Sequence, residues 1–104
     1  MTVDVEVPGA FTVDDVWRVP AAIRALSREQ RPAALGRARE AAQSALTAIL
    51  ERVEVPMVWH DDGRLTFFPH DAADVAAVRA AEAAARTVHA HLAAVLRDPG
   101  VVRE

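Results

Sequence analysis

The stretch from Val55 to Pro69 decides the fold, and it reads VPMVWHDDGRLTFFP. Two short runs rich in β-branched and aromatic residues flank the sequence Asp61-Asp62-Gly63, a pattern typical of a β-hairpin that closes on a tight turn. Long alanine-rich segments with helical periodicity lie on both sides of it. The hairpin is therefore expected between two helical halves of the chain.

The register of this hairpin depends on which residues form its turn. If Asp62 and Gly63 are the two central turn residues, the facing pairs are Asp61–Arg64, His60–Leu65, Trp59–Thr66 and Val58–Phe67. One face then carries Val58, His60, Leu65 and Phe67, and the other carries Met57, Trp59, Thr66 and Phe68. Both faces are largely apolar in this register. We therefore expect both to be covered, by the first strand, a helix or a second copy of the chain.

The segment before the hairpin is predicted to contain one strand and two short helices. Alternating apolar and acidic residues predict the strand over Thr2–Val7. Thr12 and Asp15 have the spacing of a capping box and predict the first helix over Val13–Arg18, which would present Val16 and Trp17. Proline suits the first turn of a helix, so a second helix is expected to start at Pro20. The residues that this helix would bury are Ile23 and Leu26.

Two longer helices are predicted on either side of the hairpin. The first runs from Ala33 to about Val53, and its apolar positions at helical spacing are Leu35, Ala38, Ala42, Ala45, Leu46, Ile49 and Val53. The second follows Asp71 as N-cap, has Asp74 in its first turn and runs to about Arg97. Its apolar seam repeats twice per heptad and consists of Val78, Ala81, Ala85, Val88, Leu92 and Val95. Because alanine also fills most of its back, we expect this helix to pack on two sides.

Together these elements predict a single α+β domain over residues 1–104. Their order is an N-terminal strand, short helices, a long amphipathic helix, the hairpin at about 55–69 and a long C-terminal helix at about 71–97.

Composition argues against several classes of partner. With 52% hydrophobic and 26% charged residues, the chain belongs among ordered globular proteins. Its net charge is −3 and it has no long runs of like charge, so the sequence predicts no basic surface that would bind nucleic acid or an anionic membrane. Apolar runs are shorter than the about 18 residues of a membrane span, and no signal peptide is visible, so we expect a cytoplasmic location. Arginine without lysine, beside abundant alanine, is a usage typical of GC-rich bacterial genes.

The residue types that are missing narrow the possible chemistry. The sequence has no lysine, cysteine or tyrosine, which removes Schiff-base, thiol and phenolic catalysis. Ser27 and Ser44 fall inside helical patterns rather than on an exposed elbow. The four glycines are scattered, so no glycine-rich loop can hold a phosphate group. No cofactor is expected, and any catalysis would have to use His, Asp, Glu or Arg.

One group of titratable residues surrounds the second strand of the hairpin. His60 and His70 bracket this strand and stand near several aspartates. Such a cluster can bind a divalent metal or transfer protons. The catalytic candidates are His60, His70 and Asp71, and the metal candidates are His60, Asp62, His70 and Asp74. Each aspartate also suits an ordinary role in a turn or a helix cap, and no recognised ligand spacing is present.

The apolar residues predict self-association. The interface candidates are Trp59, Phe67, Phe68, Val78, Ala81, Ala85, Val88, Leu92 and Val95, so a homodimer would use the helix seam, the hairpin or both. We therefore expect a non-enzymatic accessory or regulatory module that acts through protein contacts, an antitoxin-like neutraliser being one concrete form. The main alternative is a small metal-dependent or acid–base enzyme that uses the His/Asp cluster. A third is a small-molecule binder with an aromatic pocket formed by Met57, Trp17, Trp59, Phe67 and Phe68.

Overall fold

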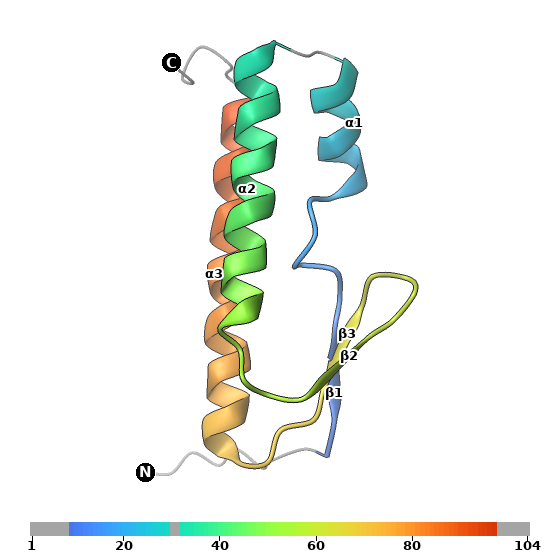
Figure 1. The fold of residues 1–104 in the computed structure, drawn as a ribbon, viewed down its shortest axis with the longest axis vertical. Helices are drawn as coiled ribbons and strands as arrows, with labels where there is room; N and C mark the ends of the chain where they lie inside the picture. The colour runs from blue at the N-terminus through green and yellow to red at the C-terminus, as the bar shows by residue number, and fades with distance from the viewer. Residues whose placement is uncertain (1–8, 30–31, 98–104) are drawn as a thin grey trace.

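The computed structural model describes residues 9–29 and 32–97 of the chain (Figure 1). The elements in chain order are β1 (Phe11–Val13), α1 (Ala21–Glu29), α2 (Ala33–Glu51), β2 (Met57–Trp59), β3 (Leu65–Phe67) and α3 (Ala72–Arg97). The long helices α2 and α3 lie side by side and run antiparallel, and α1 and the sheet lie along one side of this pair. The predicted α+β fold with a hairpin and a long C-terminal helix is confirmed. The strand predicted over Thr2–Val7 lies outside the described residues.

The three strands form one antiparallel sheet in the order β1-β3-β2. Strand β3 is central, because Phe67 lies opposite both Phe11 of β1 and Met57 of β2. The ring of Phe11 is 6.0 Å from that of Phe67 and 4.8 Å from the guanidinium carbon of Arg79 in α3. These ring contacts tie the edge strand β1 to both the central strand and the long helix.

The hairpin register differs by one residue from the predicted one. Trp59 lies opposite Leu65, not Thr66. The loop contains three residues, because the amide of His60 donates to the carbonyl of Arg64 at 2.9 Å and the amide of Gly63 donates to the carbonyl of His60 at 3.0 Å. Gly63 has φ of +94°, the left-handed conformation that closes three-residue hairpin loops. The two-residue turn was therefore the wrong choice of loop.

This one-residue difference changes which side chains share a face of the sheet. The inner face carries Phe11, Val13, Met57, Trp59, Leu65 and Phe67, and the outer face carries Thr12, Val58, His60 and Thr66. Leu65 and Phe67 are fully buried, whereas Thr12 and Val58 are exposed. The expectation that both faces are apolar and covered was wrong. The inner face is apolar and is buried at Val13, Leu65 and Phe67 but exposed at Trp59, and the outer face is mostly polar.

The helix predicted over Val13–Arg18 is also absent. Phe11–Val13 is strand β1, and the chain then turns through bonds from the Val16 amide to the Asp14 carbonyl at 2.6 Å and from the Arg18 amide to the Asp15 carbonyl at 3.2 Å. Pairing with β3 outweighs the local capping signal, because it buries Val13 beside Leu65. Val16 and Trp17 are nevertheless buried, from a turn instead of a helix.

The three helices follow the predicted periodicity more closely. The buried residues of α2 are Leu35, Ala42 and Leu46, and those of α3 are Val75, Val78, Ala85, Leu92 and Val95. The Asp71 carboxylate caps α3 by accepting the amide of Asp74 at 2.9 Å, as predicted. In α1, Ile23 is half-buried but Leu26 is 47% exposed, so the expectation that Leu26 points inward was wrong. No helix in the described parts of the chain is long and apolar enough to cross a membrane.

Candidate functional site

The hairpin end of the predicted His/Asp cluster is held by hydrogen bonds. His60 Nε2 lies 2.6 Å from Thr66 Oγ1, and Thr66 Oγ1 lies 2.8 Å from Thr12 Oγ1, so a polar row crosses the outer face of all three strands. Asp62 accepts the backbone amide of Arg64 at 3.1 Å and its Nε at 2.8 Å. The amide and then the guanidinium of Arg64 lower the pKa of the Asp62 carboxyl below its usual range. The carboxylate thus belongs to the loop structure.

The other end of the cluster forms the start of α3. Asp71 is the N-cap, and the Asp74 carboxylate accepts the backbone amide of His70 at 2.7 Å. These two residues lie beyond one end of β3, whereas Asp62 lies beyond its other end. Within residues 9–29 and 32–97, no group of three or more His, Cys, Asp or Glu side chains could hold a metal ion. The structure therefore divides the predicted catalytic and metal candidates between a turn and a helix cap.

A polar cavity that the sequence did not indicate lies between the turn after β1 and helix α3. It has a volume of about 380 Å³ and is lined by Asp14, Asp15, Val16, Pro20, Arg86 and His89. Beside this lining, Nε2 of His89 is buried and has no hydrogen-bond partner among the described residues. The lining comes from segments about seventy positions apart, so no local motif could have predicted it. Its two carboxylates, guanidinium and imidazole can hydrogen-bond a small polar molecule.

The aromatic residues divide between core and surface. Trp17 and Phe67 are almost fully buried and meet edge to face with ring centres 6.4 Å apart. Trp59 and Phe68 are 49% and 41% exposed. The cavities at the β1–α1 turn and between α2 and α3 have no tryptophan or phenylalanine in their linings. These three cavities are therefore not the predicted aromatic pocket.

The exposed apolar residues of the hairpin form a surface that we call the hairpin patch, defined as Val58, Trp59 and Phe68. Val58 is 48% exposed, close to the values for its two neighbours. The amide of Phe68 donates to the carbonyl of Pro56 at 2.9 Å, so Phe68 lies opposite Pro56 and diagonal to Val58 on the outer face. Trp59 projects from the same edge strand toward the other face. The patch thus lies on both faces of β2 and on the outer face directly after β3.

The seam of α3 packs within the chain. Val78, Ala85, Leu92 and Val95 are buried, and Ala81 and Val88 are half-buried. The predicted interface residues of this seam, together with the buried Phe67, therefore already contact the rest of the same chain.

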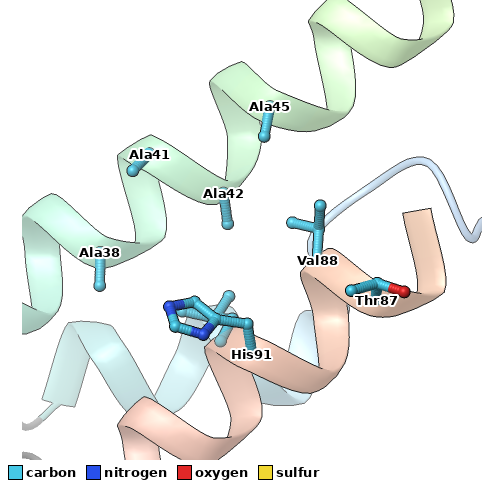
Figure 2. A pocket seen from close by; sticks show the side chains of 8 residues that line it. Ala38, Ala41, Ala42, Ala45, Thr87, Val88 and His91 are labelled. Carbon is cyan, nitrogen blue, oxygen red and sulfur yellow. The ribbon is translucent and has the colours of Figure 1, made fainter. Parts of the chain in front are cut away.

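A groove between α2 and α3 lies beside that seam, and Figure 2 shows one part of it. This cavity has a volume of about 470 Å³ and is lined by Ala38, Ala41, Ala42, Ala45, Thr87, Val88, His91 and Leu92. A second cavity of about 270 Å³ continues between the same helices, lined by Ile49, Arg52, Val53, Ala77, Ala80, Ala81 and Ala84. We call the two together the α2–α3 groove. Neither lining contains a residue of the sheet or of α1, so the groove lies on a side of the helix pair that these elements leave uncovered.

The comparisons with known proteins add no relative to this description. No family model matches the chain, and no curated protein or solved structure matches it significantly.

Proposed function

We propose that this chain is a non-enzymatic interaction module that acts as a homodimer through the hairpin patch. The observation that carries the proposal is the exposure of Val58, Trp59 and Phe68, between 41% and 49%, on and beside the edge strand β2. Tryptophan and phenylalanine are enriched in the centres of protein interfaces, where they become fully buried.

The clustering of these side chains supports the proposal. Single exposed apolar residues are normal on a protein surface, but contiguous ones mark contact sites. Phe68 is the diagonal neighbour of Val58 on the outer face, and Trp59, the next residue of β2, presents its side chain on the other face of the same strand. The core consists of other aromatic and aliphatic residues, and none of these three side chains belongs to it. Their exposure is thus not a requirement of the fold.

The enzyme alternative receives less support from the geometry. Four of its five candidates make hydrogen bonds that hold the hairpin or cap α3, and the fifth, His70, is exposed; the four are His60, Asp62, Asp71 and Asp74. Acid–base chemistry needs an acid and a base that can reach the same substrate, and nucleophilic chemistry needs a base beside the nucleophile. The candidates instead serve two separate pieces of local structure.

Light scattering coupled to size-exclusion chromatography at micromolar concentration tests the homodimer. We expect a mass of twice 11.2 kDa for the unmodified chain. The double variant Trp59→Thr/Phe68→Thr is expected to elute as a monomer, because its patch loses both aromatic anchors. Leu26→Ser is the matched control, since Leu26 is equally exposed but lies on α1. A monomeric unmodified chain contradicts the proposal, and a double variant that stays dimeric contradicts the assignment to this patch.

A further inference from the structure

We infer that two copies of the chain join through the free edges of β2, which pair antiparallel about a two-fold axis at Val58. The two three-stranded sheets then form one continuous six-stranded sheet. This inference rests on the proposed homodimer and specifies its geometry. It is carried by the direction of the main-chain groups in β2, which is independent of the exposed side chains.

The hydrogen bonds of the hairpin fix that direction. The amide of His60 donates to Arg64, and the amide of Phe68 donates to Pro56, both at 2.9 Å. In an antiparallel ladder, hydrogen-bonded pairs alternate with pairs that are not hydrogen-bonded. The His60 and Pro56 pairs are of the first kind, so Val58 also bonds to β3. Met57 and Trp59 therefore direct their N–H and C=O groups away from β3, toward the outer edge.

Apart from the shortness of β2, which has three residues, this outer edge has no charged residue or proline to protect it. Native sheets shield their edges with charged residues, prolines or bulges. The segment Met57–Trp59 contains no charged residue and no proline. Pro56 bonds toward β3 through its carbonyl, so its missing N–H does not interrupt the outer edge. Within the described residues β2 pairs with β3 alone, and Figure 1 shows the hairpin extending away from α2 and α3.

A second copy matches this edge in both backbone and side chains. With the axis at Val58, Met57 lies opposite the partner's Trp59, and the two residues exchange both N–H···O bonds. The same pair occurs again on the other side of the axis. Both side chains point to the inner face, where a thioether contacts an indole, and Val58 meets the partner's Val58 on the outer face.

Other symmetric registers pair fewer residues of β2 with residues of the partner's β2. An axis at Trp59 would place Met57 opposite the partner's Asp61, and an axis at Met57 would place Trp59 opposite the partner's Val55, outside the strand. Only the axis at Val58 pairs all three residues of β2 with residues of β2. A strand from a different protein could pair with the same main-chain groups, so what favours a second copy is the contact between Met57 and the partner's Trp59, which occurs on both sides of the axis.

Disulfide trapping tests the geometry directly, because the chain has no cysteine of its own. In Val58→Cys, pairing about the axis places the two new thiols opposite each other at an effective concentration in the millimolar range. At micromolar protein we expect this variant to form a disulfide-linked dimer roughly 100-fold faster than Leu26→Cys. Leu26 is the matched control, since it is 47% exposed and Val58 is 48% exposed. Equal rates for the two variants overturn the inference.

A second pair of variants separates the main chain from the side chain. Trp59→Thr and Trp59→Pro both remove the indole, but only proline removes the outward N–H. The hairpin itself does not use that N–H, so Trp59→Pro should fold like Trp59→Thr while its dimer dissociation constant is roughly 10–100-fold higher. Equal dissociation constants contradict edge pairing.

The combined outcomes distinguish this inference from the proposed homodimer. A dimer by light scattering with no preferential trapping at residue 58 leaves the homodimer intact and overturns the β2 geometry. A monomer overturns both. A monomer in which the amides of Met57 and Trp59 exchange slowly with solvent shows instead that the edge is covered by another part of the same chain. Slow exchange only after a different protein is added identifies a foreign strand as the occupant.

Discussion

The hairpin patch and the α2–α3 groove are both apolar surfaces, but they differ in what a partner would gain from covering them. The patch contains large side chains beside main-chain groups of β2 that have no strand partner in residues 9–29 and 32–97. The groove is lined mostly by alanines on helices whose main-chain bonds are internal. Burying one large apolar side chain contributes about 1.5–3 kcal/mol, against about 0.8 kcal/mol for a single methylene-sized group. Covering a given area at the hairpin should therefore contribute more binding free energy than covering the same area on the helices.

The same contrast separates the sources of stability in the two regions. The helix pair is stabilised by side chains that interlock along its buried seam. The hairpin is stabilised by a three-residue loop, short strands and a polar row on its outer face. Mutations should therefore act through packing in one region and through backbone conformation in the other.

The largest effect is expected in the helix pair, from Leu92→Ala. Leu92 is 1% exposed, so truncation leaves a cavity and should lower the free energy of unfolding by about 2–5 kcal/mol. Denaturant unfolding measures this change. The control Ala94→Ser, at an exposed position of α3, should stay within about 0.5 kcal/mol. If Leu92→Ala weakened the dimer and left the stability of the single chain unchanged, the seam would be an interface between copies.

Two glycine substitutions, one in each region, should change the free energy of unfolding in opposite directions. Gly63→Ala in the hairpin should lower stability by about 1–3 kcal/mol, because φ is +94° and the new Cβ would lie 2.5 Å from Arg18 Nη1. Gly36→Ala in α2 should raise stability by about 0.5–1 kcal/mol, because nothing lies within 4 Å of the new Cβ and alanine favours helix. Thermal and denaturant unfolding measure both. If Gly63→Ala raised the free energy of unfolding as Gly36→Ala does, the positive φ of the three-residue loop would be contradicted.

A smaller effect is expected at the start of α3. Asp71→Ala removes the N-cap bond to the Asp74 amide and should cost about 1 kcal/mol. Asp71→Ser, which keeps a capping oxygen, should recover most of the loss. Asp61→Ala in the exposed hairpin loop serves as the control for removing a carboxylate. A loss at Asp71 no larger than at Asp61 would show that the cap contributes nothing.

The smallest effect concerns the hairpin loop at low pH. The pKa of Asp62 is lowered mainly by the Arg64 amide, so the loop contact is present above the ordinary aspartate pKa and is lost as pH falls through the lower folded-state value. Because Asp62 is exposed, the change in global stability should be close to the limit of detection. An NMR titration of the Asp62 carboxyl measures the pKa itself. Arg64→Ala should reverse only part of the lowering, and a full return to the ordinary value would assign it to the guanidinium instead.

Sequence reasoning succeeded where one local rule determines the outcome. In α2 and α3, the helical repeat alone decides which side chains share a face, so the burial of Leu46 and Leu92 could be predicted. The cap at Asp71 is likewise a contact between residues three positions apart. Such features need no knowledge of the rest of the chain.

Sequence reasoning failed where segments that are far apart in the sequence meet in the fold. A change of one residue in the hairpin loop exchanged the faces of the sheet, and sequence gave no reason to prefer three loop residues over two. Phe11–Val13 became a strand because β3 offers it a partner 54 positions away. The cavity that His89 helps to line also combines such segments, and packing between distant segments places Trp17 and Phe67 in the core.

The pairing of β1 with β3 also sets an order on folding. Thr12 and Thr66 are 54 positions apart, so the ribosome needs roughly 3–11 s to make the segment that separates them, at about 5–20 residues per second. The hairpin partner of β3 is only a short loop away, and hairpins form in about 1–10 μs. During synthesis β1 is therefore made first but paired last, and for those seconds Phe11 and Val13 depend on nearby chain or on chaperones to stay out of wrong contacts.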